Sequence, residues 1–268
     1  MGKQEKVTIF IKKEQITGNQ ARLTEEERNY IKNVLRMRPG HNLLLCDGEG
    51  TIYEAKIREI GAAEVICYLL KDGRVAEEQP EGWSADTELP GRLVLFQGLP
   101  KRDKLEWIIQ KAVELGAAEI VPVQMTRTVV KLEDTKKEAK KLERWRSIAK
   151  NAAQQSGRGR LPEISPVISF SEALAKADEL DYNMIPYEKA ENIAESKAVI
   201  KEATKRQSVG IFIGPEGGIT EEELQLALAS GVKPISLGRR ILRTETAGLA
   251  ALSLVMFEME AGQEWKHI

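Results

Sequence analysis

The sequence predicts two domains: a small β-barrel with one helix, followed by an α/β domain built on a parallel sheet. Short β-branched and aromatic runs separated by glycine turns occupy residues 1–72, a pattern typical of a small β-rich module. Residues 73–90 lose this periodicity and accumulate acidic residues, glycine and proline, which indicates a linker. From residue 91 to residue 268, apolar runs of strand length alternate with stretches of helix length. That alternation predicts a parallel sheet covered by helices.

The first domain is predicted to contain one helix among several strands. Thr24-Glu-Glu-Glu27 matches a capping box, so a helix is expected to start there and to run to about Met37. Alternating or β-rich runs predict strands at residues 7–11, 42–46, 51–60 and 63–70.

The second domain is predicted to alternate strands and helices to its end. Strands are expected at residues 93–96, 119–123, 183–185, 209–213 and 234–237, and helices at 103–115, 135–156, 193–204, 220–229 and 247–259. Thr244 or Thr246 is expected to cap the last helix. Ligands of open parallel sheets bind at the carboxyl ends of strands, where Pro186, Gly214 and Gly238 fall.

Two glycine-containing segments are the strongest candidates for ligand loops. They are Ile211-Phe-Ile-Gly-Pro-Glu-Gly-Gly218 and Leu237-Gly-Arg-Arg-Ile-Leu-Arg-Thr-Glu-Thr-Ala247. Gly217 and Gly218 can adopt positive φ and allow a ligand to approach the main chain closely, which suits a flat polar ligand. Neither segment has the P-loop or G-x-G-x-x-G spacing that binds nucleotide phosphates. Either segment alone could be an ordinary strand-to-helix turn, but two in one domain favour a binding site.

The charge of the chain argues against a uniformly basic nucleic-acid binder. The formal net charge is −1 over 268 residues, so any affinity for RNA must come from a local surface. Residues 131–160 contain ten Lys or Arg against four acidic residues. This stretch is a candidate for contacts with phosphates, and the alternative is a solvated helix with i,i+4 ion pairs.

Metal and membrane functions find little support in the composition. The two cysteines, Cys46 and Cys67, lie in separate apolar segments, and the two histidines are His41 and His267, so no metal site is expected. No apolar run reaches the length that spans a bilayer, and the lysine-rich start lacks the apolar core of a signal peptide. A cytoplasmic protein without membrane partners is expected.

Several phrases, in this order, resemble the RsmE family of methyltransferases. Besides the two loops they are Gln97-Gly-Leu-Pro-Lys101, Gln110-Lys-Ala-Val-Glu-Leu-Gly116 and Gln155-Ser-Gly-Arg158. The resemblance implies a PUA-like first domain that holds RNA and a second domain of the SPOUT type with a C-terminal trefoil knot. It also implies a homodimer that uses S-adenosylmethionine to methylate N3 of uridine 1498 in 16S ribosomal RNA of the small subunit. The chain departs from the family at Val7-Thr-Ile-Phe10, where the family typically places an arginine.

The resemblance also assigns roles to residues. Arg243 is the candidate for stabilising the uracil anion, and Glu216 or Glu245 is the candidate general base, either of which could instead hold a helix terminus or pair with an arginine. Residues expected to bind the cofactor are Pro186, Gly214, Pro215, Glu216, Gly217, Gly218, Leu237, Gly238, Ile241, Leu242, Thr244, Thr246 and Ala247. Residues expected to bind RNA are Lys12, Arg36, Arg38, Lys101, Arg102, Arg158 and Arg160.

Two other functions remain compatible with the sequence. One is an RNA-binding or assembly protein that has lost turnover, against which the intact glycine loops argue. The other is a SPOUT enzyme that methylates a ribose 2′-hydroxyl, a reaction that needs no deprotonation of N3. The apolar face of the last helix could likewise serve as core or as a dimer interface.

Overall fold

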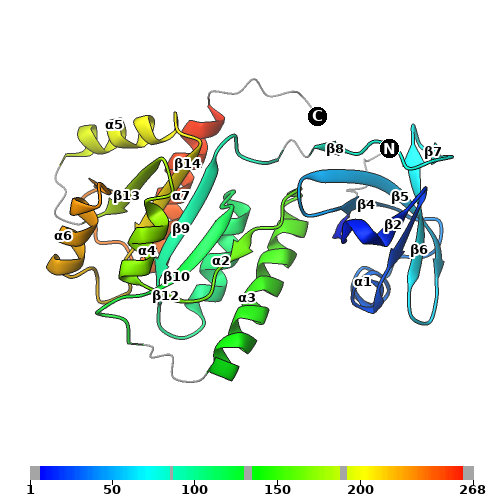
Figure 1. Ribbon diagram of the computed structural model, residues 1–268, viewed down its shortest axis with the longest axis horizontal. Coiled ribbons are helices and arrows are strands. Elements are labelled where there is room, and N and C mark those ends of the chain that lie inside the picture. The colour runs from blue at the N-terminus through cyan, green and yellow to red at the C-terminus, as the bar shows by residue number, and fades with distance from the viewer. Residues whose placement is uncertain (1–6, 85–86, 130–134, 188–191, 262–268) are drawn as a thin grey trace. The chain divides into compact units, whose positions relative to one another are not determined.

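The computed structural model describes residues 7–84, 87–129, 135–187 and 192–261, which fall into two compact units (Figure 1). The first unit comprises Met1–Glu88 together with Ala153–Leu161, and the second comprises Leu89–Ala152 and Pro162–Ile268. The first unit is therefore built from two stretches of chain that are far apart in the sequence.

The first unit is a curled sheet of eight strands in the order β1-β4-β5-β6-β3-β2, with β7 paired to β6 and β8 to β5. Its strands pair antiparallel, except that β1 runs parallel to β4. The strands are β1 (Thr8–Phe10), β2 (Ile16–Thr17), β3 (Gln20–Leu23), β4 (Asn42–Cys46), β5 (Thr51–Ile60), β6 (Val65–Lys71), β7 (Arg74–Val75) and β8 (Trp83–Ser84). The predicted strands at 42–46 and 51–60 are confirmed, whereas β2 and β3 were not predicted.

One helical segment covers this sheet, as predicted. Helix α1 (Glu25–Asn29) starts at the N-cap Thr24, whose backbone N–H donates to Glu27 Oε2 at 2.8 Å in the expected capping box. The chain continues as a π-helical turn (Tyr30–Val34), in which Ile31 is fully buried among the apolar side chains of the strands. A short 3-10 helix (Lys13–Gln15) precedes β2.

The first unit is completed by the later segment Ala153–Leu161. The carboxylate of Glu88 accepts hydrogen bonds from Arg158 Nη2 at 2.7 Å and from the backbone N–H groups of Gly159 and Arg160 at 3.0 Å each. The thiol of Cys46 donates to the carbonyl oxygen of Gly159 at 2.8 Å. Part of the expected linker, namely β7, β8 and Glu88, thus belongs to the first unit.

The second unit contains a parallel sheet in the order β11-β10-β9-β14-β13-β15, with β12 beside β10, which confirms the predicted fold class. The strands are β9 (Arg92–Gly98), β10 (Glu119–Gln124), β11 (Glu163–Ile164), β12 (Ile168–Ser169), β13 (Tyr182–Pro186), β14 (Ser208–Ile213) and β15 (Lys233–Ile235). The helices are α2 (Lys104–Glu114), α3 (Thr135–Gln155), α4 (Phe170–Ala177), α5 (Ile193–Ala203), α6 (Glu221–Ala229) and α7 (Thr244–Glu260). Helix α4 was not predicted.

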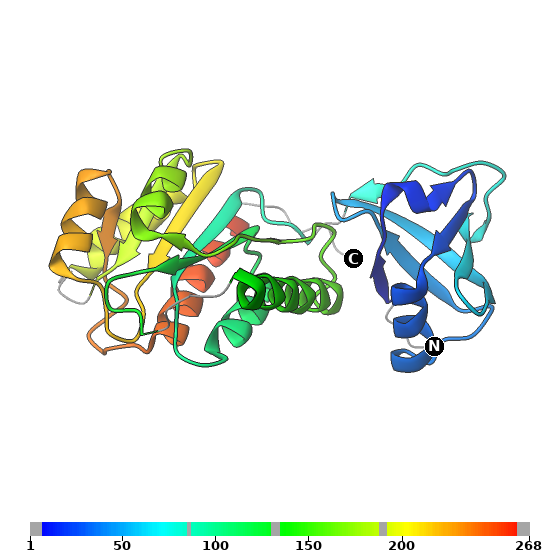
Figure 2. The same ribbon diagram turned by 60° about the horizontal axis from the view of Figure 1, so that its bottom comes forward.

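Helices cover both faces of this sheet (Figure 2). On one face α4 and α6 pack onto a core in which the rings of Phe96 and Phe212 stack at 4.4 Å between centroids. Helix α7 packs on β9 and β14 and also contacts α2 and α5. Since neighbouring residues of a strand face opposite sides, Ile213 meets α7 while Phe212 faces α4 and α6. This arrangement brings the start of α7 to the carboxyl end of the central strands.

Candidate active site

A cavity of about 490 Å³ lies at the carboxyl ends of β13, β14 and β15. It is lined by both predicted ligand loops, which follow β14 and β15. Every residue expected to bind the cofactor lines it except Thr246; those present are Pro186, Gly214, Pro215, Glu216, Gly217, Gly218, Leu237, Gly238, Ile241, Leu242, Thr244 and Ala247. Lys104, Arg127, Tyr187 and Arg240 also line the cavity and were not predicted to do so.

The first loop requires glycine because other parts of the chain approach its backbone closely. A Cβ on Gly98, at the end of β9, would lie 2.7 Å from the backbone nitrogen of Pro215, and a Cβ on Gly217 would lie 2.8 Å from Cβ of Arg127. Gly218 has a φ of +75°, which residues other than glycine rarely adopt. Arg127 also donates from Nη1 to the carbonyl oxygen of Gly217 at 2.9 Å. The loop is therefore fixed before any ligand binds.

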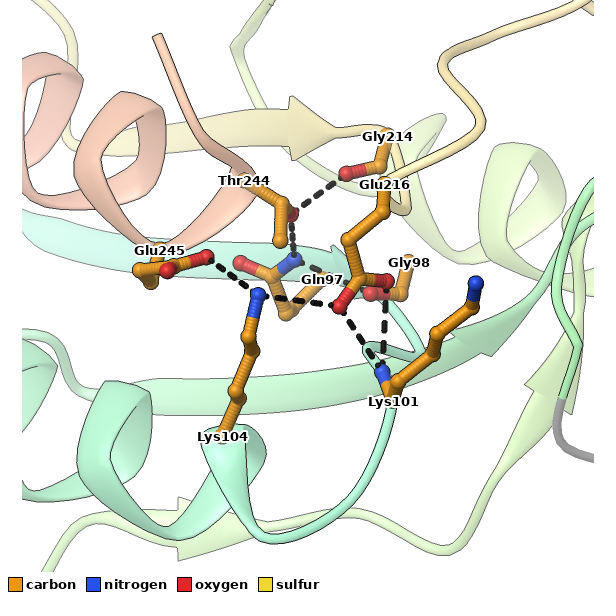
Figure 3. A network of polar contacts seen from close by, with 8 residues as sticks. All are labelled: Gln97, Gly98, Lys101, Lys104, Gly214, Glu216, Thr244 and Glu245. Atoms are coloured by element: carbon orange, nitrogen blue, oxygen red, sulfur yellow. Dashed lines mark hydrogen bonds and ion pairs between the residues drawn. The ribbon is translucent and has the colours of Figure 1, made fainter.

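A neutral hydrogen-bond chain joins this loop to the start of α7 (Figure 3). The hydroxyl of Thr244 donates to the carbonyl oxygen of Gly214 at 2.6 Å and accepts from Nε2 of the fully buried Gln97 at 2.9 Å. The prediction that Thr244 or Thr246 caps this helix is wrong. The N-cap is Arg243, whose side chain makes no capping hydrogen bond, and Thr244 is the first residue of the helix, with its hydroxyl bonded to the first loop.

An ionic bridge makes a second connection between the same two elements (Figure 3). Lys104 Nζ lies 3.1 Å from Glu216 Oε1 in the first loop and 3.2 Å from Glu245 Oε2 in the first turn of α7. The backbone N–H of Lys101 also donates to both carboxylate oxygens of Glu216, at 3.0 and 3.2 Å. The start of α2 thus holds the two loops through one ammonium group. Nothing in the local sequence signals this bridge, since Lys104 and Glu245 are far apart in the chain.

The protonation of this bridge is set by its partners. Burial acts to raise the pKa of Glu216, but the backbone N–H groups of Glu216 and Lys101 and the ammonium of Lys104 together hold the pKa of this carboxyl below its ordinary 4.5. Hydrogen bonds to Glu216 and Glu245 raise the pKa of Lys104 above its ordinary 10.5. Lys104 and Glu216 are therefore charged at neutral pH, and Glu216 is a weak proton acceptor.

Like Arg240, which is also exposed at the cavity, Arg243 is available to a ligand. Its side chain is exposed and lines the cavity, and its guanidinium makes no ion pair within the described ranges. Glu216 and Glu245, by contrast, are both engaged by Lys104. Glu245 does not line the cavity. Of the three predicted catalytic residues, Arg243 alone combines access to the cavity with a free functional group.

Most residues expected to bind RNA lie at the surface, with one exception. Lys12, Arg36, Arg38 and Arg160 are exposed in the first unit, and Lys101 and Arg102 are exposed in the second. Arg158 is only 3% exposed and pairs with Glu88, so it is placed as a structural residue and not as an RNA contact. The basic stretch at 131–160 lies mostly on α3, and residues 131–134 fall outside the described part of the chain.

Neither a metal site nor a membrane-spanning helix is found in the part of the chain that the structure describes. Among the described residues, no group of three or more His, Cys, Asp or Glu side chains is placed to bind a metal ion. No helix in the described ranges has the length and apolar character needed to cross a membrane.

Comparison with known proteins identifies the family of the chain. An RNA methyltransferase domain family matches residues 87–256, and an RNA methyltransferase PUA domain family matches residues 23–67. The chain is 39% identical over 241 residues to ribosomal RNA small subunit methyltransferase E of Bacillus subtilis, with 89% of this chain and 90% of that protein covered. The chain belongs to the RNA methyltransferase family. The enzyme of the same name from Synechocystis is 31% identical, with 94% of this chain and 78% of that protein covered.

The fold of this RNA methyltransferase is also similar to that of a solved structure. The crystal structure of a ribosomal RNA small subunit methyltransferase E from Neisseria gonorrhoeae, bound to S-adenosyl methionine, aligns with a TM-score of 0.79 at 30% sequence identity. The alignment covers 94% of this chain and 98% of that one. The parallel-sheet domain and the PUA-like domain of this RNA methyltransferase are therefore shared with a relative that holds this cofactor.

Proposed function

We propose that this protein uses S-adenosylmethionine to methylate N3 of uridine 1498 in 16S ribosomal RNA of the small subunit. The observation that carries the proposal is the meeting of two glycine-containing loops in one cavity, at the carboxyl edge of a parallel sheet, with the exposed Arg243 on its wall. Membership of the RNA methyltransferase family supports methyl transfer to RNA. The proposed target nucleotide follows from the name of the relatives, ribosomal RNA small subunit methyltransferase E.

The cavity fits this cofactor in size and in chemistry. Pockets for ligands of this size typically enclose about 300 to 1,000 Å³. Gly214 and Gly217 have no room for a side chain, because a Cβ on either would lie 2.8 Å from atoms of Ile219 or Arg127, and both residues line the cavity. Pro186, Leu237 and Ile241 supply apolar contacts around it. When bound, S-adenosylmethionine would supply an electrophilic methyl group.

Arg243 supplies the electrostatic part of the mechanism. N3 of uridine becomes a nucleophile by losing its proton, and the resulting negative charge spreads onto O2 and O4. A guanidinium beside either oxygen stabilises this anion and lowers the pKa of the N3–H group. Because Glu216 has a lowered pKa and Glu245 does not line the cavity, we assign both carboxylates to holding the loops, and the N3 proton leaves to solvent.

We further propose that the enzyme acts in the cytoplasm as a homodimer and that the chain between β13 and α7 forms a trefoil knot. Phe257 on α7 is 67% exposed, and Leu254 on α7 and Trp107 on the adjacent α2 are also exposed apolar side chains. Exposed apolar surface of this kind is typical of a protein interface. The exposed cations Lys12, Arg36, Arg38, Lys101, Arg102 and Arg160 are proposed to contact phosphates of the ribosomal RNA.

The test is the identification of the methylated nucleoside. Purified protein is incubated with labelled S-adenosylmethionine and with small subunits from a strain that lacks the modification, and the RNA is then digested. N3-methyluridine at one position is expected, and reverse transcription should stop there because N3 lies on the pairing face of the base. A ribose-methylated product would contradict the proposed reaction, and tight RNA binding without transfer would contradict the proposed enzyme.

A further inference from the structure

We infer that Lys104 is a positioning residue for methyl transfer, which acts by holding the first turn of α7 and thereby placing Arg243. This inference rests on the proposed function and goes beyond it, because Lys104 belongs to neither ligand loop. Its ammonium lies between two carboxylates that come from different elements, Glu216 after β14 and Glu245 in α7. A cation in this position couples the two elements mechanically.

The side chain of Arg243 makes no local contact that would hold it, and its backbone carbonyl accepts one hydrogen bond, from the N–H of Ala247 at 2.8 Å. Arg243 occupies the N-cap of α7 without a side-chain cap, so the start of the helix depends on contacts made by the next two residues. Thr244 is held by Gly214, and Glu245 is held by Lys104. Removing the lysine would release one of these two contacts, and the backbone that carries Arg243 would sample more positions. Catalysis by a positioned charge is sensitive to displacements of this size.

The first loop would keep its structure without Lys104. Glu216 would still accept both hydrogen bonds from the backbone N–H of Lys101, and Gly217 would still be held by Arg127. The first loop therefore retains these three hydrogen bonds, while the first turn of α7 loses the ion pair between Glu245 and Lys104. This asymmetry predicts a large effect on the rate of transfer and a small effect on the affinity for S-adenosylmethionine.

The chain offers a closely matched control on the same helix. Lys111 lies on α2, forms an ion pair with Glu114 at 2.7 Å, and has a side-chain exposure of 34%, compared with 35% for Lys104. It does not line the cavity. Lys111→Met therefore removes the same charge, with an acidic partner, at a similar exposure, but breaks an ion pair that lies within α2. Lys104→Arg keeps a cation that can reach two carboxylates and should restore most of the lost rate.

The experiment compares the variants by single-turnover transfer, by calorimetric titration with S-adenosylmethionine, and by thermal unfolding. For Lys104→Met we expect a transfer rate about 10- to 100-fold lower, a Kd changed by less than about threefold, and a melting temperature close to that of Lys111→Met. Glu245→Ala should lower the rate similarly. The double variant should be no slower than the slower single variant, because both changes remove the same Lys104–Glu245 ion pair.

Amide hydrogen exchange provides a readout that does not depend on turnover. Lys104→Met should accelerate exchange in the first turn of α7, and Lys111→Met should not. If the wild-type protein bound S-adenosylmethionine but methylated no RNA, the proposed function would be wrong. Hydrogen exchange would still show whether Lys104 holds the first turn of α7. Unchanged exchange, equal transfer rates in the two lysine variants, or a Kd that weakens in proportion to the rate would each overturn the inference.

Discussion

At the scale of single residues, the charged side chains near the cavity are of two kinds: those that form ion pairs and those that do not. Arg243 is exposed with an unengaged guanidinium in the described part of the chain, whereas Glu216 and Glu245 share the ammonium of Lys104. Paired carboxylates contribute to structure, and a free cation at the cavity wall can respond to charge that develops on a substrate.

Replacing Arg243 by alanine should therefore impair chemistry more than binding. We expect Arg243→Ala to lower the single-turnover rate about 100- to 1,000-fold, the usual effect of removing one charge-stabilising donor. The Kd for S-adenosylmethionine should change little in a calorimetric titration. Arg239→Ala is the control, since Arg239 is exposed in the same loop without lining the cavity. Equal rates for the two variants at saturating RNA would remove Arg243 from the mechanism.

The lowered pKa of Glu216 predicts a defined dependence of stability on pH. A carboxyl whose pKa is lower in the folded state stabilises the fold above its ordinary pKa, and this contribution is lost as the pH falls. The difference in unfolding free energy between wild type and Glu216→Gln should thus be constant near neutral pH and should shrink below pH 4.5. Urea unfolding at a series of pH values measures it. A difference that did not shrink would show that the charge of Glu216 is unimportant for stability.

At the scale of elements, one hydroxyl group connects a helix to a loop. Thr244 is buried, donates to Gly214 and accepts from Gln97, so the start of α7 and the end of β14 are fixed to β9. The helix begins where this contact is made and not where a side chain caps it. The position of the helix is consequently coupled to the shape of the cofactor loop.

Removal of this hydroxyl should be measurable as a loss of stability. Thr244→Val keeps the shape of the side chain but removes the donor to the half-buried carbonyl of Gly214 and one of the two acceptors of the buried Gln97 amide. We expect a cost of about 1 to 3 kcal/mol in the free energy of unfolding, determined by urea titration. Thr244→Ser retains the hydroxyl and should cost less. If Thr244→Val cost no more than Thr244→Ser, the hydrogen bonds of the hydroxyl would contribute no more to stability than the packing of the methyl group.

The elements also show which parts of the structure could be predicted from the sequence. Long periodic runs identified β5, β10, α2 and α3 because their apolar spacing records which face is buried. Helix α4 was missed although Ser169 and Glu172 form a capping box that could have indicated it. Strands β2 and β3 are too short for periodicity to detect. Contacts such as Gln97 with Thr244 join residues 147 positions apart, and no local pattern encodes them.

At the scale of the whole molecule, the first unit depends on a segment that the chain supplies late. Glu88 is the centre of this arrangement, since its carboxylate accepts hydrogen bonds from Arg158, Gly159 and Arg160. Arg158 was predicted to contact RNA because it ends a basic stretch and belongs to the phrase Gln155-Ser-Gly-Arg158, which resembles the RsmE family. Its burial follows from pairing with a carboxylate in a region that looked like a linker.

Removing the Glu88 carboxylate should destabilise the first unit. Glu88→Ala leaves the buried guanidinium of Arg158 without this partner, and breaking such a pair typically costs about 3 to 5 kcal/mol. Hydrogen exchange detected by mass spectrometry should show faster exchange in β4 and β5 and little change in β9. Glu78→Ala removes an exposed acidic residue of the same region and is the control. Equal exchange in both variants would show that Glu88 does not stabilise this unit.

The proposed homodimer makes a prediction at the same scale. Phe257→Glu places a charge in the exposed apolar surface of α7 and should yield a monomer by light scattering, because an unpaired charge in an interface is costly. Leu226→Glu is the matched control, since Leu226 is a 56% exposed apolar residue on α6. Monomers in the wild type, or dimers in both variants, would contradict the proposed interface.

The division of the first unit between two stretches of chain also bears on how the protein is made. Translation delivers residues 7–88 before residues 153–161 exist, so the nascent first unit carries Glu88 without Arg158 and Cys46 without Gly159. Folding in the order of synthesis, which small N-terminal domains commonly follow, cannot finish here until part of the second unit has emerged. The PUA-like unit and the methyltransferase unit are therefore expected to mature together.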